Sequence, residues 1–187
     1  MSVKKTVTIV GILCTIIVLA CVILSQTLTK GTPRTPRITV INASLAKFYL
    51  NNNTLDYNLA LNIAFRNPSI TKPINYKHIE TTARYIDERF PLETFTSSPF
   101  KQGARDTNVL SLNFQGQQIV KFSENVISQF QSETAAGAYT INVAVVLQIQ
   151  KFSYKPHVLC LLKVPMIFNS TSTSGSFRVT QCSVQKN

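Results

Sequence analysis

The first thirty residues lack the alternation of polar and apolar positions seen in the rest of the chain. Between residues 6 and 29 no residue is charged, and residues 7–24 are apolar apart from two threonines and one glycine. A helix of this length covers about 27 Å, close to the roughly 30 Å thickness of a bilayer's hydrocarbon core. The pattern predicts a transmembrane helix over residues 6–29, preceded by a cytosolic tail of residues 1–5.

Two other interpretations of this apolar run stay open. A cleavable secretory signal normally has an apolar core of only about 7–15 residues and a small-x-small cleavage site, and no clean site of that kind follows the run. Residues 18–21, Val-Leu-Ala-Cys, loosely resemble a bacterial lipobox, but three apolar residues follow the cysteine. A membrane anchor fits the length of the run better than either.

Beyond the run the hydrophobic period changes to two. Residues 31–37 read GTPRTPR, and the two prolines favour an extended spacer, so residues 30–37 are predicted to form a stalk. Apolar and polar side chains then alternate over residues 55–65 and again over 139–150, as expected for strands with one buried face. Shorter strands are predicted at 38–42, 74–85, 108–114, 158–164 and 177–184.

These seven strands predict an all-β sandwich that occupies residues 38–187. One helix is expected within it, at residues 123–132, where Val126, Ile127 and Phe130 fit helical spacing and Ser123 is a suitable N-cap.

Flanking charge does not decide which side of a membrane holds this domain. Lys4, Lys5 and the free amine precede the run and three cations follow it closely, so the positive-inside rule is nearly balanced. The tail before the run is too short to fold, so an anchor would deliver everything after it across the membrane. N-glycosylation sequons begin at Asn42, Asn52 and Asn169, each in a turn-like stretch, which also favours an extracellular domain.

Cysteine placement supports the same compartment. Cys14 and Cys21 lie in the apolar run, which leaves Cys160 and Cys182 in the domain, equidistant from residue 171 in a polar stretch. A hairpin centred there would set the two cysteines opposite each other, about 4.5–5.5 Å apart at Cα, which a disulfide can span. Two small buried thiols remain the alternative.

Four segments match the order and spacing of motifs in a known family. Residues 55–69, LDYNLALNIAFRNPS, are similar to the family's alternating strand that closes in Asn-Pro-Asn, here Asn67, Pro68 and Ser69. Residues 79–90 look like a strand and turn often filled by Tyr-Asp-Gly, here changed to Tyr-Ile-Asp.

Residues 98–110 are similar to the family's Pro-Phe-x-Gln-Gly stretch, and the matching residues are Pro99, Phe100, Gln102 and Gly103. Gly137 and Tyr139 open the late strand as in relatives. A single Lys at 151 stands where the family usually has an Arg pair.

With these motifs the chain resembles the plant harpin-induced and non-race-specific-disease-resistance-like membrane proteins, whose outer part is a late-embryogenesis-abundant group-2 domain. The resemblance implies an immunoglobulin- or fibronectin-III-like β-sandwich of about seven strands, a plasma-membrane location and a role in pathogen and stress responses. Physically, Pro68 and Pro99 are expected to end strands, and Gly103 and Gly137 to permit tight turns, so the signature is interpreted as architectural.

The sequence offers little chemistry for an enzyme. There are two histidines, His78 and His157, no nucleophile elbow, no phosphate loop and no metal-ligand spacing. The adjacent acids Asp87 and Glu88 fall in a predicted turn, where solvated carboxylates are common. We therefore expect a protein without catalytic activity, cofactor or metal.

Charge gives more information about partners. Residues 31–187 hold 16 of the 19 Lys and Arg residues and all 8 Asp and Glu residues, a net charge of +8. We expect residues 6–29 to contact the lipid bilayer and the domain to contact anionic cell-wall polysaccharide, anionic lipid or a membrane protein, with self-association as a further option. No nucleic-acid motif is present. A lipid or small-ligand carrier with a cleft between its sheets, and a stress-protective protein, are the alternatives, as is a scattered basic surface without a partner.

Overall fold

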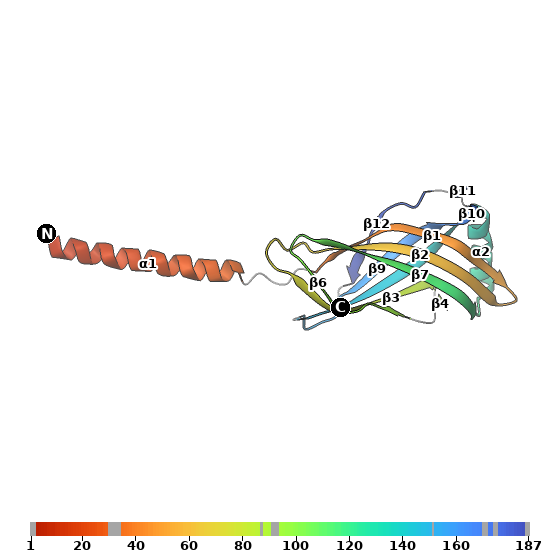
Figure 1. Ribbon diagram of the computed structural model, residues 1–187, viewed down its shortest axis with the longest axis horizontal. Helices are drawn as coiled ribbons and strands as arrows, with labels where there is room; N and C mark the ends of the chain where they lie inside the picture. Colours follow the sequence, from red (N-terminus) through yellow and green to blue (C-terminus); the bar gives the residue numbers. More distant parts are fainter. Residues whose placement is uncertain are drawn as a thin grey trace. The chain divides into compact units, whose positions relative to one another are not determined.

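The chain forms two separate units, Met1–Pro33 and Arg34–Asn187, in a computed structural model (Figure 1). The structure describes residues 3–29, 35–86, 88–90, 94–150, 152–169, 172–173 and 176–185. For residues 3–10, 26–29, 168–169 and 172–173 only the backbone is described. Most of the predicted stalk, residues 30–34, lies outside the described residues.

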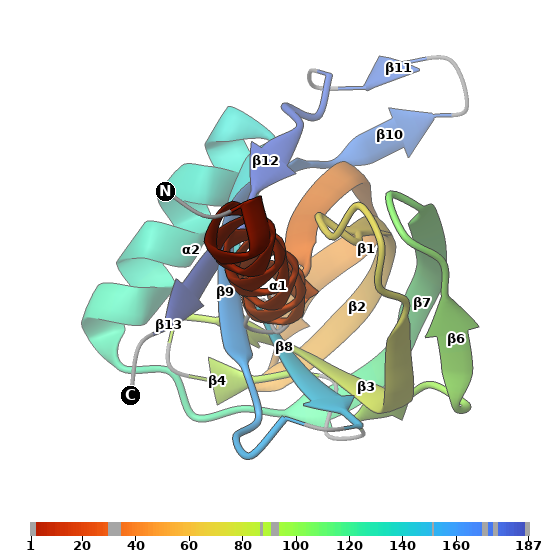
Figure 2. The same ribbon diagram turned by 90° about the vertical axis from the view of Figure 1, so that its left-hand side faces the viewer.

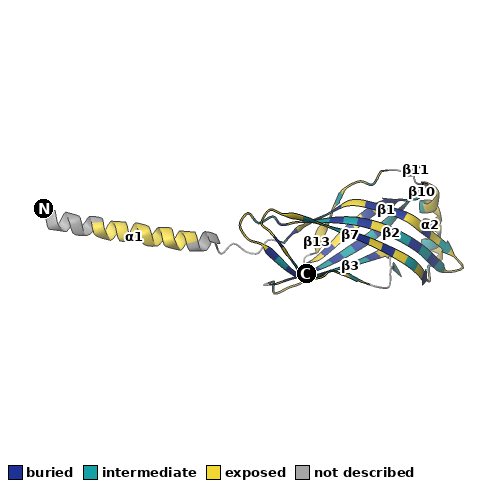
Figure 3. Ribbon diagram, viewed as in Figure 1, coloured by how far each residue is buried: buried dark blue, intermediate teal, exposed yellow. Residues whose placement is uncertain are grey.

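The first unit contains one helix, α1 (Val3–Thr29). Its described side chains, those of residues 11–25, are all exposed (Figure 3). The hydroxyls of Thr15 and Ser25 each donate a hydrogen bond of 2.7 Å to a carbonyl three residues earlier in the helix. Among the residues that the structure describes, no helix combines the length and the apolar character needed to cross a membrane.

The second unit begins with a four-stranded antiparallel sheet in the order β12-β1-β2-β7. Its strands are β12 (Thr180–Gln181), β1 (Arg37–Asn51), β2 (Thr54–Arg66) and β7 (Thr107–Ile119). The turn between β1 and β2 consists of Asn52 and Asn53, whose φ values are 46° and 63°. Two left-handed residues make this the primed hairpin turn whose twist matches that of the strands, and asparagine tolerates that conformation.

The second sheet has the order β13-β9-β8-β3-β4, with β5 and β6 also paired to β3. Its strands are β13 (Ser183–Gln185), β9 (His157–Pro165), β8 (Ala138–Ile149), β3 (Ile74–Tyr85), β4 (Glu88–Arg89), β5 (Phe95–Thr96) and β6 (Phe100–Gln102). β10 (Ile167–Asn169) and β11 (Ser172–Thr173) form a separate small hairpin. The helix α2 (Glu124–Ala136) packs where β8 begins.

The two sheets face each other and enclose one core (Figure 2). Buried and solvent-facing residues alternate along the long strands, as Figure 3 shows. The core includes a cluster of rings around Phe48, whose centroid lies 4.7 Å from that of Tyr139, 5.1 Å from that of Phe90 and 5.4 Å from that of Tyr85. The prediction of a mainly β, two-sheet domain is confirmed, whereas its assignment to the immunoglobulin or fibronectin-III class stays a prediction.

The end of the chain differs from the single strand predicted at residues 177–184. β12 pairs with β1 in the first sheet, and β13 pairs with β9 in the second, so the chain crosses between sheets at Cys182. The Cys182 amide donates to the Ile38 carbonyl at 3.0 Å. Cys182 and Cys160 form a disulfide with a Cα separation of 4.5 Å, so the predicted pairing is present.

Candidate functional site

One end of the β domain is organised by a buried asparagine that follows β2. Asn67 has no exposed surface, and its side-chain amide donates to the carbonyls of Lys72 at 2.9 Å and Gly103 at 2.8 Å. Its side-chain oxygen accepts the Ser69 amide at 2.9 Å. Because a buried polar group must find partners, these bonds hold the loop after β2 against the turn after β6.

A second buried amide, Gln102 on β6, ties the same end together. Its Nε2 donates to the carbonyls of Phe65 at 2.6 Å and Asp106 at 3.2 Å, and its Oε1 accepts the Tyr76 hydroxyl at 3.0 Å. Burial raises the pKa of Tyr76 far above its ordinary value, so the phenol stays neutral and remains a donor. We call Asn67, Tyr76 and Gln102 the polar junction, since they connect β2, β3 and β6.

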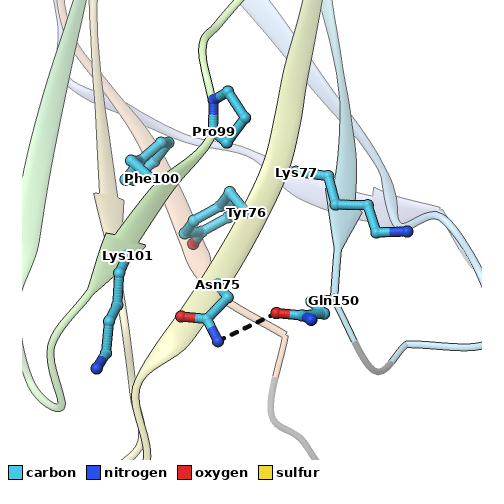
Figure 4. Close-up of a pocket in the computed structure, with 7 residues that line it drawn as sticks. All are labelled: Asn75, Tyr76, Lys77, Pro99, Phe100, Lys101 and Gln150. Atoms are coloured by element: carbon cyan, nitrogen blue, oxygen red, sulfur yellow. Dashed lines mark hydrogen bonds between the residues drawn. The ribbon is translucent and has the colours of Figure 1, made fainter.

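A solvent-open hollow of about 390 Å³ lies beside the polar junction. The Phe100 ring stacks on Tyr76, with centroids 4.6 Å apart and planes inclined by 17°. Asn75 donates to the side-chain oxygen of Gln150 at 3.3 Å, and Lys77 and Lys101 flank this amide pair on either side (Figure 4). Figure 4 also shows Pro99 beside Phe100 at the rim.

The hollow lies at an end of the domain that carries mostly positive charge. Register places the start of β1, the end of β2, the start of β7 and the start of β3 together at this end. The connection from β8 to β9 lies there too, because the backbone amide of Gln150 donates to the Asn75 carbonyl at 2.8 Å. We call its exposed cations the basic end: Arg37, Arg66, Lys72, Lys77, Lys101, Arg105 and Lys155. The acidic residue described at this end is Asp106, and its carboxylate accepts a hydrogen bond from the Thr107 amide at 2.8 Å. The opposite end mixes both signs, with Glu88, Glu124 and Glu133 near Arg89 and Lys121.

Six of the eight signature residues therefore lie at or near the basic end, and one of their expected roles needs correction. The chain turns at residues 104–105, directly after Gly103, and the residue of this turn with positive φ is Arg105 at 58°. A Cβ at Gly103 would make only ordinary contact with Asp106, 3.6 Å away. Pro99 precedes β6 and does not end a strand, whereas Pro68 does follow β2 as expected.

Gly137 and Tyr139 lie at the opposite end of the domain. Gly137 ends α2 in the left-handed conformation at φ 68°, as the prediction of a tight turn requires, and its amide donates to the Thr134 carbonyl at 3.1 Å. The Tyr139 hydroxyl donates to the Phe48 carbonyl at 3.1 Å. Both residues therefore have architectural roles.

The three sequons lie in different settings. The prediction that Asn42 lies in a turn is wrong: it is an exposed residue within β1, opposite Asn62, next to a register shift in the strand. Asn52 is exposed in the β1–β2 turn as expected. The side chain of Asn169 lies outside the described residues, and glycosylation of all three stays a prediction.

The described residues hold little reactive chemistry. No group of three or more His, Cys, Asp and Glu residues suited to a metal is found among them. His78 lies 2.9 Å from the Glu80 carboxylate, both partly exposed on β3, and His157 is exposed on β9. Asp87 lies outside the described part, so its predicted turn setting beside Glu88 stays a prediction.

Sequence reasoning identified Asn67 and Gln102 as signature residues but missed what they do. Their partners lie up to 37 residues away in the chain, so no local pattern could reveal the polar junction. The clustering of seven cations at one end was missed for the same reason, because it depends on strand register.

Comparisons with known proteins find relatives of which this chain covers 65–70%. No family model matches the chain. The NDR1/HIN1-like protein 10 of Arabidopsis thaliana is 35% identical over 161 residues, 80% of this chain and 70% of that protein. The NDR1/HIN1-like protein 3 of the same plant is 34% identical over 160 residues, 81% of this chain and 68% of that protein. The NDR1/HIN1-like protein 2 is 30% identical over 80% of this chain and 65% of that protein. A crystal structure of a protein from Archaeoglobus fulgidus matches with a TM-score of only 0.36 and 12% identity, over 70% of this chain and 99% of that one.

Proposed function

The chain belongs to the NDR1/HIN1-like family, and from that premise we propose that it is a non-enzymatic protein of plant defence and stress responses. In this proposal residues 6–29 tether it to the plasma membrane, with the N-terminus in the cytosol. The β domain, of the late-embryogenesis-abundant group-2 type with an immunoglobulin- or fibronectin-III-like sandwich, lies outside the cell. There its basic end binds acidic cell-wall polysaccharide as an adhesion or signalling module.

The sequence of α1 supports the tether. The uncharged stretch of residues 6–29 is longer than the roughly 20 residues that a membrane-spanning helix needs. Within it, the structure describes the side chains of residues 11–25. The hydroxyls of Thr15 and Ser25 bond to carbonyls within the helix, so they need no water partner. In lipid an unsatisfied polar group is costly, and these two are satisfied.

The Cys160–Cys182 disulfide supports the extracellular side. Disulfides persist in oxidising compartments and are rare in the cytosol, where thiols are kept reduced. The exposed Asn52 in the β1–β2 turn is well presented for glycosylation in the same secretory route.

The observation that carries the binding role is the basic end, whose seven exposed cations include two, Lys77 and Lys101, that line a hollow presenting amides and an aromatic ring. Lysine ammonium groups attract the carboxylates of an acidic polymer, while Asn75 and Gln150 offer hydrogen bonds to sugar hydroxyls. The Phe100 ring provides a flat apolar surface at the rim. Sites of this kind are concave, with a few convergent polar groups that fix orientation.

Binding of the full chain in detergent micelles to immobilised polygalacturonate tests this role. We expect retention at low salt that falls as salt rises, because exposed charge contacts are screened. A Lys77→Gln/Lys101→Gln variant is expected to bind about tenfold more weakly, from about 0.5–1 kcal/mol for each exposed contact. The matched control, Lys121→Gln/Lys163→Gln, removes the same charge from exposed positions away from the basic end and should change affinity less than about twofold.

Three outcomes would contradict the role. The wild-type chain could fail to bind at low ionic strength, both double variants could lose affinity equally, or neutral dextran could bind equally well. Equal loss would mean that overall charge, not the basic end, determines binding. Binding to anionic vesicles but not to polygalacturonate would instead identify lipid as the partner.

We do not propose a carrier function. In the described part of the chain, the space between the sheets is filled by buried apolar side chains contributed by both sheets. We therefore propose no second function.

A further inference from the structure

β7 is a long edge strand with uncharged side chains. It pairs with β2 over its whole length, from Thr54 opposite Ile119 to Arg66 opposite Thr107, and no described strand pairs with its other side. Its thirteen residues, TNVLSLNFQGQQI, include no charge and no proline. In Figure 1 it lies along the side of the domain next to β2.

The other strands at the sheet edges are short. β12 pairs with β1 only at Thr39 and Val40, and the rest of that edge of β1 carries a charge, Lys47, and an isolated bridge at Leu45. β12, β4 and β5 have two residues each, and β13 and β6 have three. Natural sheets usually protect their edges by short strands, charges or proline, because exposed backbone groups recruit further strands. β7 has none of these protections.

Hairpin geometry shows which backbone groups of β7 are free to pair. Asn51 and Thr54 flank a two-residue turn and therefore form a hydrogen-bonded pair, so the backbone groups of Thr54 point toward β1. Successive residues of a strand point their backbone groups to opposite sides, so those of Leu55 point toward Gln118 of β7. The β2–β7 register runs without a shift, so the even-numbered residues of β7 bond to β2. The odd-numbered residues point their backbone groups outward, and their side chains are exposed on the outer face: Val109, Ser111, Asn113, Gln115 and Gln117.

We propose that β7 pairs antiparallel with β7 of a second copy of this chain, giving a two-fold dimer with one continuous sheet. In a register centred on Asn113, Ser111 faces Gln115 and Val109 faces Gln117 of the second copy. These cross-strand pairs are uncharged, and most are hydrogen-bonding. Because residues 31–187 carry a net charge of +8, two copies repel through much of their surface, whereas β7 offers a contact without like charges. This inference is independent of the proposed polysaccharide binding.

Light scattering on the full chain in detergent micelles, over a series of concentrations, tests the dimer. We expect the wild-type mass to approach two chains and a Ser111→Lys/Gln115→Lys variant to dimerise at least tenfold more weakly, since lysines would face lysines across the contact. A matched variant on exposed positions of α2, Gln129→Lys/Ser132→Lys, should dimerise like the wild type. A monomeric wild type, or a dimer unaffected by the lysines on β7, would overturn the proposal.

Cross-linking gives a second readout that does not depend on the lysine variants. In a Cys14→Ser/Cys21→Ser background, Asn113→Cys is expected to form a covalent dimer under mild oxidation, because the two thiols face each other across the axis. Asn125→Cys, exposed on α2, is the control. If the Asn113→Cys variant cross-linked no faster than the Asn125→Cys variant, the pairing of β7 with β7 would be contradicted. If monomeric chains instead bound a strand of a different protein along β7, the proposed dimer would also be wrong.

Discussion

Replacing Gln102 by alanine is expected to lower the free energy of unfolding by about 3–5 kcal/mol. The substitution removes the partners of the Phe65 and Asp106 carbonyls and of the Tyr76 hydroxyl, all at a buried position. Each buried polar group left without a partner costs about 1–3 kcal/mol. The loss falls on the polar junction that joins β2, β3 and β6.

Urea denaturation of the full chain in micelles, followed by the signal of the β domain, measures this loss. Gln131→Ala is the matched control, because Gln131 is exposed on α2, away from the polar junction and from β7; we expect a change within about 0.5 kcal/mol. Gln102→Met keeps the side-chain volume but removes the hydrogen bonds. If Gln102→Met were as stable as the wild type, the polar junction would not stabilise this end.

Phe48→Ala is expected to destabilise the domain by about 3–5 kcal/mol, the range for large aromatic side chains removed from a core. Phe48 is 1% exposed, and its ring contacts the rings of Tyr85, Phe90 and Tyr139. The ring of Phe130 on α2 also lies against it, with ring centroids 5.6 Å apart. The cavity would lie where both sheets and α2 meet, so the surroundings cannot close it without moving all three.

The adjacent residue provides the control for this prediction. Tyr49 is 47% exposed on the other face of β1, and Tyr49→Ala should cost less than about 1 kcal/mol. Denaturant midpoints of both variants, together with near-ultraviolet circular dichroism of the ring cluster, make the comparison. Equal costs for the two substitutions would contradict the assignment of Phe48 to the core.

The strands with strict alternation could be predicted from the sequence because one face is buried along their whole length. Residues 55–65 and 139–150 correspond closely to β2 (Thr54–Arg66) and β8 (Ala138–Ile149). β1 was predicted only at 38–42 because register shifts after Val40 and Leu45 change the phase of alternation twice. Each such irregularity inserts an extra residue, which a period-two pattern does not tolerate.

The end of β7 was missed for a different reason. Residues 115–118 of its last part are three glutamines and Gly116, which carry no apolar signal, and only Ile119 follows them. A Cβ at Gly116 would lie 2.7 Å from the Tyr57 hydroxyl, so the glycine permits close approach of the tyrosine across the sheet. In sequence alone, glutamines beside a glycine indicate a loop.

The disulfide was predicted by symmetry about residue 171, and the β9–β13 register follows the same centre, with Ser183 opposite Leu159. The prediction of one hairpin between residues 158–164 and 177–184 is only partly confirmed. β13 pairs with β9 as that hairpin requires, but β12 pairs with β1 of the other sheet. The polar junction and the basic end could not be derived from sequence, since both depend on segments distant in the chain that the fold brings together.

Protease protection in sealed microsomes tests most directly whether residues 6–29 tether a β domain that lies outside the cytosol. Protease added to the cytosolic side should leave residues 34–187 intact until detergent opens the vesicles, and the chain should stay with the membranes in a carbonate wash. Glycosidase treatment should shift the mobility of the protected chain, and the shift should shrink in an Asn52→Gln variant. Digestion of the β domain in intact microsomes, or release of the chain by carbonate, would contradict the account.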